Sequence, residues 1–321
     1  MKSKVNDSVN MLLDMAPDPI PRFILLKEFK GITSNDAEYR NLYEQVCSQR
    51  YVKTYETTQN ERGFWQPFHG YTESIIRKLL SFGLDKKHIC LKRVSDYLVK
   101  VLNNEEEWNQ YEKQDNPLWY PKMFMPLVSA AMLSLIDNDN PVLQNHRQQW
   151  SYIAEASFSY GTYDRYKNIE AINDCFGFYT KRPIAPFNYY SLLLLTPDDN
   201  CSYIDAATDK ALVDYFMNEA GGLGYVYNNK LFDMISITAQ NRDSREFWHW
   251  IRALSIISRF HAWSTYSGKY YDHIISQVNE DGLWEFPKKF DFVLSNSWRG
   301  KNKVIDSSVY VIRMLKGLRA F

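Results

Sequence analysis

Residues 277–286 read QVNEDGLWEF, and this stretch joins the end of a helical segment to a tryptophan that follows a glycine. A glycine just past a helix takes the left-handed backbone conformation at no steric cost, so Gly282 predicts a helix end. Trp284 can then fold back over that end. Residues 59–65, QNERGFW, repeat the same order and finish on Trp65. The recurrence predicts a structural corner that the chain uses more than once.

The Asn-Glu-x-Gly sequence of this corner occurs three times, at 60–63, 218–221 and 279–282. After the first and last copies, a loop leads to a second helical segment. The two segments match, because 74–79 reads SIIRKL and 310–315 reads YVIRML. Helix, corner and helix therefore form one repeated unit. The predicted structural corner residues are Gly63, Trp65, Gly221, Gly282 and Trp284.

Apolar residues at helical spacing run through most of the chain. Helices are expected at 36–54, 72–82, 88–102, 126–136, 144–158, 206–217, 245–263, 269–278 and 306–318. Strand signals are weak, because few runs alternate with a period of two. One helical hairpin cannot bury both of its faces, so hairpins must stack. The sequence predicts an all-α protein of about five to six hairpins in a single domain, 1–321, with N-terminal helices at 1–30.

Composition excludes several classes of function. The 321 residues carry 38 basic and 38 acidic side chains, so no net charge favours nucleic acid or an anionic membrane surface. Aromatic residues reach 16%, which is typical of a large aromatic core or of a cavity for an apolar or cationic ligand. The longest apolar run, Met123–Ile136, is too short to span a bilayer, and the N-terminus does not resemble a signal peptide. We expect a cytoplasmic protein.

Metal and cofactor motifs are absent from the sequence. The four cysteines form no CxxC pair and are expected to be isolated, buried thiols: Cys47, Cys90, Cys175 and Cys201. The six histidines contain no HExxH and no pair four residues apart. The glycine-rich 221–224 follows a helix rather than a strand and lacks the Lys-Ser/Thr of a phosphate-binding loop. No metal or cofactor is therefore expected.

The two tryptophan corners resemble the QW motif of squalene cyclases and of the related prenyltransferase repeats. In that motif a glutamine caps a helix end and stacks on a tryptophan. Gln59 with Trp65, and Gln277 with Trp284, carry the likeness, which covers mainly the first 85 and last 60 residues. The resemblance implies an α/α toroid with inner and outer helices around a central cavity. It also implies cyclisation or transfer of isoprenoids, although some members of the family are uncharacterised single toroids.

Two residue sets of that family are missing. Class II terpene cyclases protonate an alkene with an Asp-x-Asp-Asp acid, whereas 137–140 reads DNDN and is interpreted as a helix-ending loop. A second polar stretch, 198–200, is interpreted as the start of a helix. Protein prenyltransferases hold zinc with an Asp, a Cys two residues later and a distant His, whereas Asp174 and Cys175 are adjacent.

Candidate site residues come from the polar loops that would enter the inner helices of a toroid. Glu73 and Asp306, at what look like equivalent hairpin positions, are the candidate catalytic carboxylates, and Arg299 is a candidate anion clamp. Alternatively, both carboxylates are charges at helix N-termini that favour the helix dipole. The candidate substrate-binding residues are His69, Thr72, Tyr163, Asp164, Trp298 and Trp250. For Trp250, packing in the core is the alternative.

Three classes of function remain open. A terpenoid cyclase or prenyltransferase-like toroid would bind a small apolar or isoprenoid-type ligand, and predicts a deep aromatic cavity with one buried acid of raised pKa. A non-catalytic toroid that binds a ligand or a protein predicts polar residues that all have structural partners. A carbohydrate-active α/α toroid predicts an open cleft with two carboxylates between exposed aromatic residues. The sequence gives no oligomeric state.

Overall fold

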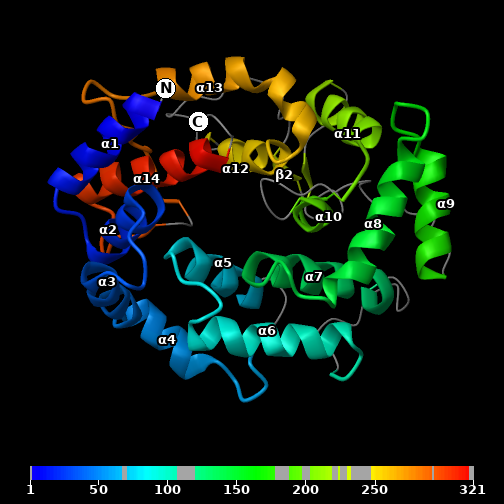
Figure 1. The fold of residues 1–321 in the computed structure, drawn as a ribbon, viewed down its shortest axis with the longest axis horizontal. Coiled ribbons are helices and arrows are strands. Elements are labelled where there is room, and N and C mark those ends of the chain that lie inside the picture. The colour runs from blue at the N-terminus through cyan, green and yellow to red at the C-terminus, as the bar shows by residue number, and fades with distance from the viewer. Residues whose placement is uncertain are drawn as a thin grey trace. The chain divides into compact units, whose positions relative to one another are not determined.

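The structure is a computed structural model that describes residues 2–66, 71–106, 120–177, 188–196, 203–218, 223–224, 230–232, 247–290 and 293–317. Regular structure in these ranges is almost entirely helical, which confirms the predicted all-α class (Figure 1). The one exception among them is an antiparallel pair of very short strands, β1 (Leu223–Gly224) and β2 (Lys230–Phe232). No helix in the described part of the chain is both long and apolar enough to cross a membrane.

The helices begin and end as follows. The N-terminal ones are α1 (Lys2–Asp14), α2 (Pro19–Leu25), η1 (Leu26–Lys30), α3 (Ala37–Cys47), α4 (Arg50–Thr58), α5 (Glu73–Ser81) and α6 (Ile89–Leu102). The middle ones are η3 (Tyr120–Phe124), α7 (Met125–Ile136), α8 (Leu143–Ser157), α9 (Arg165–Phe176), α10 (Tyr189–Leu195) and α11 (Ala206–Asn218). The last ones are α12 (Phe247–Ile257), η4 (His261–Thr265), α13 (Ser267–Ser276) and α14 (Lys301–Gly317).

The contacts of the chain divide it into two compact units. The first unit comprises Met1–Val94, Gln240–Ile251 and Tyr270–Phe321. The second unit comprises Ser95–Ala239 and Arg252–Lys269. The single domain and the toroid stay predictions.

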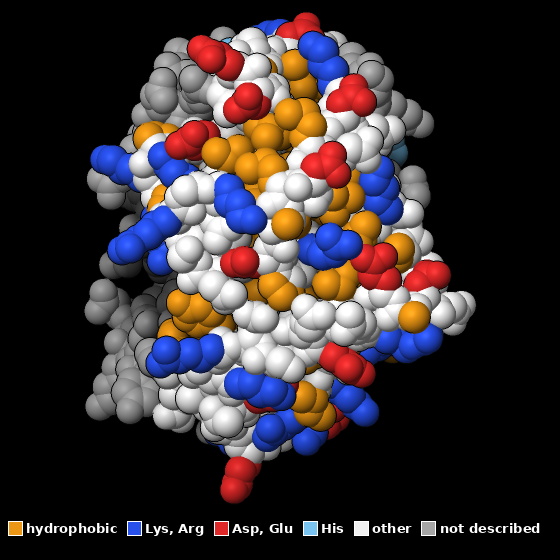
Figure 2. Space-filling model, turned by 90° about the vertical axis from the view of Figure 1, so that its left-hand side faces the viewer, with side chains coloured by type: hydrophobic (Ala, Val, Ile, Leu, Met, Phe, Trp, Pro, Cys, Tyr) orange, Lys and Arg blue, Asp and Glu red, His pale blue; other side chains and the backbone are white. Residues whose placement is uncertain are grey.

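In the first unit, α2 packs on both α3 and α14, although α2 and α14 are far apart in sequence (Figure 1). Proline at the first turn of α2 suits a position whose backbone N–H has no helical partner. Helix α5 is amphipathic and buries Ile75, Ile76 and Leu79 along one stripe. Charges of both signs alternate with apolar side chains on the face drawn in Figure 2, in keeping with the zero net charge.

The second unit is built from helical pairs. Helices α8 and α9 pack side by side, and α7 packs against α8 and α10 (Figure 1). The sequence of α7, MPLVSAAMLSLI, is apolar on nearly all sides, and ten of its residues are buried. Asp164 begins α9 by accepting the backbone N–H groups of Tyr166 and Lys167, and Gly177 ends it in the left-handed conformation.

Three predicted helices have different boundaries. The segment predicted as one helix at 36–54 forms two helices, α3 and α4, because the backbone of Gln49 is extended. The helix predicted at 245–263 ends at Ile257, and η4 begins after the extended Phe260. The helix predicted to start at 306 starts at Lys301, directly after Gly300 with its positive φ of 51°. Asp306 therefore lies inside a helix rather than at its first turn.

The described thiols agree with the prediction only in part. Cys47, Cys90 and Cys175 are free, but of these three Cys90 is buried whereas Cys47 and Cys175 are half-buried; Cys201 lies outside the described residues.

Candidate functional site

The first tryptophan corner is closed by a small set of hydrogen bonds. The backbone N–H of Asn60 donates to the Phe64 carbonyl at 2.9 Å, and the Asn60 side-chain oxygen accepts the Phe64 N–H at 3.1 Å. Gly63 adopts a φ of 98° and donates its N–H to the Asn60 carbonyl at 3.0 Å. The indole N–H of Trp65 donates to the carbonyl of Tyr55, in the last turn of α4, at 2.8 Å.

The second corner repeats these bonds with different residues. Asn279 N–H donates to the Leu283 carbonyl at 2.7 Å, and the Asn279 side chain accepts the Leu283 N–H at 2.9 Å. Gly282 has a φ of 75° and donates to the Asn279 carbonyl at 3.0 Å. The indole of Trp284 donates to the Ile274 carbonyl, again ten residues back, at 2.9 Å. The same hydrogen bonds therefore recur at these two corners, whereas Gly221 lies outside the described residues.

A hydroxyl group then locks each tryptophan to the following helix. Thr72 donates to the Trp65 carbonyl at 2.6 Å and accepts the Trp65 N–H at 3.0 Å. Ser308 does the same for Trp284, at 3.0 and 2.9 Å. Thr72, a predicted substrate-binding residue, is thus fully buried and engaged in the corner.

The two glutamines behave differently. The Gln59 side-chain amide donates to the carbonyls of Gly63 and Cys90 at 2.7 and 2.9 Å, which ties the first corner to the start of α6. Gln277 instead donates to the adjacent Ser276 hydroxyl at 3.0 Å. Among the described contacts, the hydrogen bond from the glutamine to the glycine carbonyl of the corner is seen at the first corner.

Asp306 is the carboxylate with the most distinctive surroundings. Its side chain is completely buried, and it accepts the Leu294 N–H at 3.1 Å and the Ser295 N–H at 3.0 Å. The Ser295 hydroxyl donates to the same carboxylate at 2.6 Å. Burial raises the pKa of Asp306 to about 6, although the hydrogen bonds from Ser295 and Leu294, and the charge of Lys78, act in the opposite direction. Asp306 can therefore change its protonation state near neutral pH.

The loop that ends at Ser295 is held on α14 by neighbouring polar residues. Ser307 accepts the Phe286 N–H at 2.9 Å, and Lys78 of α5 donates to the Val293 carbonyl at 2.6 Å. Together with Asp306 and Ser308, these groups satisfy backbone groups that the loop would otherwise bury unpaired.

Aromatic rings gather on the same loop. The ring centroid of Phe290 lies 5.1 Å from that of Phe286, 5.2 Å from that of Tyr310 and 5.3 Å from that of Trp298. All three contacts are edge-to-face. We call Phe286, Phe290, Trp298 and Tyr310 the aromatic cluster. Trp298, a predicted substrate-binding residue, is half-buried in this cluster.

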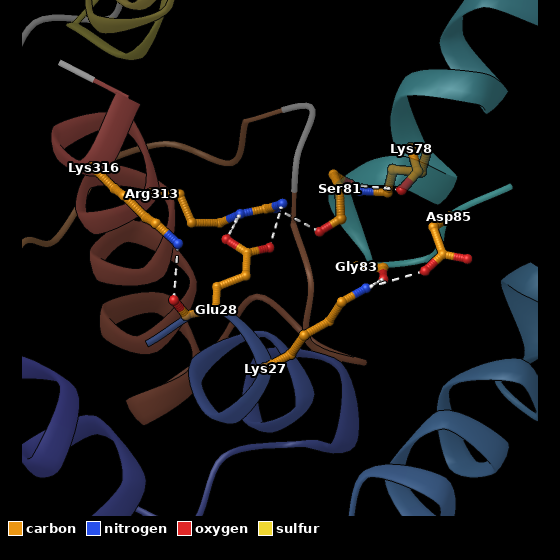
Figure 3. Close-up of polar contacts among 8 residues, drawn as sticks. All are labelled: Lys27, Glu28, Lys78, Ser81, Gly83, Asp85, Arg313 and Lys316. Atoms are coloured by element: carbon orange, nitrogen blue, oxygen red, sulfur yellow. Dashed lines mark hydrogen bonds and ion pairs between the residues drawn. The ribbon is translucent and has the colours of Figure 1, made fainter. Parts of the chain in front are cut away.

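A polar cluster fixes the two helices that carry Asp306 and Lys78 (Figure 3). Arg313 of α14 binds Glu28 at two points, 3.0 and 2.8 Å, and donates to the Ser81 carbonyl at the end of α5 at 2.8 Å. Lys27 donates to the Gly83 carbonyl at 2.7 Å. Cationic donors on the last carbonyls of a helix satisfy groups that have no helical partner. The cluster therefore links the end of α5 to α14 and to the segment that carries Lys27 and Glu28.

Glu73, Arg299 and His69 are further polar residues predicted for the site. Glu73 is buried in the first turn of α5, and it directly follows Thr72, whereas Asp306 precedes Ser308 by two residues. The two carboxylates consequently do not occupy equivalent positions relative to their corners. Arg299 is exposed, and His69 lies outside the described residues.

Trp250, Tyr163 and Asp164 have structural surroundings. Trp250 is fully buried and packs on Phe247, Tyr270 and His273, as the core-packing alternative predicts. Tyr163, in the second unit, packs on Phe158 and Tyr215, and burial raises its pKa. Asp164 caps α9.

A cleft of about 880 Å³ in the second unit was not predicted; it lies between α11 and η4. Asp209, which is 2% exposed, accepts the backbone N–H groups of His261 and Ala262 at 3.0 and 2.8 Å. A buried carboxylate that accepts two N–H groups at the start of η4 caps that helix. Asp209 is thus already satisfied within the fold.

The other polar groups of this cleft bond to one another. Tyr266 donates its hydroxyl proton to Asp214 at 2.7 Å and accepts from the Asn218 amide at 3.0 Å, and Lys210 donates to Asp214. Partial burial disfavours the charged form of Asp214, but the bonds from Lys210 and Tyr266 outweigh it and lower its pKa. The polar groups of this α11–η4 cleft therefore bond to one another, and Lys210 compensates the charge of Asp214.

Comparisons and metal donors complete the description of the site. Within the described ranges, no three or more His, Cys, Asp or Glu side chains come together as a metal site. No family model matches the chain, and no curated protein or solved structure matches it either.

Proposed function

We propose that the chain is a single α/α toroid of stacked helical hairpins, similar to the squalene cyclase and prenyltransferase repeats. The matching hydrogen bonds at Trp65 and Trp284 support this, because the same corner ends a helix at both places. A corner that turns the chain between two antiparallel helices needs neighbouring hairpins to cover its apolar faces.

The proposed toroid binds a small apolar or isoprenoid-type ligand at the segment between Trp284 and Ser308, with Asp306 of α14 as its protonatable group. One observation carries this: Asp306 is a buried carboxyl whose pKa is raised to about 6, and it accepts hydrogen bonds from Leu294 and Ser295, in the segment that carries Phe290 and Trp298. A carboxyl that is partly neutral near pH 6 can donate a proton to an apolar ligand. The faces of nearby aromatic rings attract positive charge, including that of a carbocation.

Ligand binding and turnover are tested separately. Purified chain would be incubated with farnesol and geranylgeraniol, with octanol as a chemically simpler control, and binding followed by native mass spectrometry. Products would be sought by gas chromatography between pH 5 and 8. We expect both isoprenoids to bind more tightly than octanol, and Phe290→Ala to weaken that binding.

Asp306→Asn distinguishes the catalytic form of the proposal from the binding form. We expect Asp306→Asn to bind geranylgeraniol and to form no product, whereas Asp281→Asn, at an exposed position of the same corner, behaves as wild type. Binding without any product in the wild-type chain would make it a non-catalytic ligand-binding toroid. No preference for isoprenoids over octanol would contradict the proposed ligand class.

A further inference from the structure

A polar cleft of about 650 Å³ lies in the second unit along α8. The α8 residues that line it are Gln144, Arg147, Gln148, Ser151, Tyr152 and Glu155. Their spacing of three and four residues puts them on one face of the helix, as neighbouring turns of a single wall. Asp139 and Asn140, from the turn before α8, and Tyr203, from the segment before α11, complete the lining. We call this site the α8 cleft.

The floor of the α8 cleft is rigidly built. Arg147 is only 6% exposed, donates to the Asn138 carbonyl at 2.9 Å, and its guanidinium carbon lies 4.4 Å from the ring centroid of Tyr203. The Ser151 hydroxyl donates to the Tyr203 carbonyl and so holds the same segment against α8. A guanidinium that is bonded and stacked in this way keeps one orientation, so this part of the lining is already in place before a ligand binds.

The upper wall of the cleft, by contrast, offers groups that the fold does not use. The amides of Gln144 and Gln148 are exposed and make no hydrogen bond to any residue that the structure describes. Tyr152 is 48% exposed, so one flat apolar ring borders these amides. In the α11–η4 cleft the equivalent polar groups bond to each other. The α8 cleft thus has free donors and acceptors next to a free aromatic face.

The charges around the cleft disfavour an anionic ligand and leave only a small net attraction for a cation. Asp139 and Glu155 put two carboxylates on the lining, and the guanidinium of Arg147 offsets part of their charge. Amides donate to hydroxyl groups and accept from them, carboxylates accept from them, and an exposed aromatic ring packs on an apolar ring face. We propose that the α8 cleft binds a neutral, hydroxyl-rich ligand of the saccharide class. The inference is independent of the isoprenoid site in the first unit.

Saturation-transfer NMR on the full chain tests this inference. The probes are glucose, galactose, N-acetylglucosamine, maltose and cellobiose, with glucuronate as the anionic and choline as the cationic comparison. We expect at least one neutral saccharide to give a saturable signal. Tyr152→Ala should weaken that binding about tenfold through loss of ring stacking, Tyr152→Trp should retain it, and Gln148→Ala should weaken it less.

Two matched variants show whether these effects belong to the cleft. Tyr160→Ala removes a tyrosine that is 74% exposed and lies outside the lining, and Gln45→Ala removes an exposed glutamine of α3 in the first unit. Both should bind as wild type, and thermal unfolding would check that every variant folds. The proposal is overturned if no neutral saccharide gives a saturable signal, if glucuronate or choline binds more tightly, or if Tyr160→Ala loses as much affinity as Tyr152→Ala.

Discussion

The two tryptophan corners share their hydrogen bonds, but the chain leaves them by connections of very different length. Thr72 locks Trp65 from seven residues away, whereas Ser308 locks Trp284 from 24 residues away. The longer connection carries Phe290 and Trp298, and it brings Leu294 and Ser295 onto Asp306. The repeated corner therefore supplies the scaffold, and the added residues of the second connection surround the buried Asp306.

The largest expected effect is the loss of either corner tryptophan. Trp65→Ala and Trp284→Ala should each lower the free energy of unfolding by about 3–5 kcal/mol, because both side chains are 1% exposed and each loses its indole hydrogen bond. Urea denaturation followed by circular dichroism measures this. Trp298→Ala, at a half-buried position, should cost distinctly less. Equal effects at all three positions would contradict a special role for the corners.

We expect substitution by alanine to have different effects at the two corner glycines, Gly63 and Gly282. A Cβ on Gly63 would lie 2.4 Å from the Arg93 carbonyl oxygen, whereas a Cβ on Gly282 would meet nothing within 4 Å. Gly282→Ala therefore costs only its left-handed backbone, about 1–2 kcal/mol. Gly63→Ala adds a clash with the backbone and should cost about 2–5 kcal/mol. Thermal unfolding of both variants at one pH gives the order, and a larger loss at Gly282 would contradict it.

Asp306 should make stability fall as pH rises from about 4 to 6. Its pKa lies near 6 in the folded chain, above the ordinary value of 3.8, so in this window the folded state binds more protons than the unfolded state. The contribution amounts to roughly 2–3 kcal/mol. The free energy of unfolding would be measured for wild type and for Asp306→Asn at each pH. The difference between the two proteins should change across this pH range. A difference that stays constant from pH 4 to 7.5 would show an ordinary pKa.

The smallest expected effect concerns Asp164, which was predicted to bind substrate and which caps α9 in the structure. As the cap of α9, it should cost about 1 kcal/mol when changed to alanine. Binding of geranylgeraniol should not change, because Asp164 lies in the second unit. Calorimetric unfolding and native mass spectrometry on the same sample separate the two roles. Loss of geranylgeraniol binding with an unchanged free energy of unfolding would instead assign Asp164 to the substrate site.

Local signals made the scaffold predictable. The spacing of apolar residues predicted the helices, and glycine followed by tryptophan predicted two corners, because a left-handed cap and its covering side chain lie within a few residues. The break at Gln49 was missed, since apolar spacing continues across it. The helix containing Asp306 was placed too late, because the apolar run begins several residues after the actual helix start.

The site was only partly predictable, because its contacts are not local. Asp306 and Trp298 were identified as candidates, but burial of Asp306 under the segment that follows Trp284 leaves no pattern in the sequence, because its contacts, such as that of Ser308 with Trp284, join residues up to 24 positions apart. Ser295 was missed for the same reason, as it reaches Asp306 from eleven residues away. The spacing of Gln144 and Gln148 was visible, but a polar stripe on a helix is typical of any solvent-exposed face.

The carboxyl carbon of Asp306 gives the most direct test of the claim that the second connection holds the site. Its ¹³C resonance, assigned by comparison with Asp306→Asn, would be titrated with and without geranylgeraniol. We predict a pKa near 6 in the free chain and a shift of this resonance when the ligand is added. A pKa near 4 together with a resonance that geranylgeraniol leaves unchanged would contradict the claim.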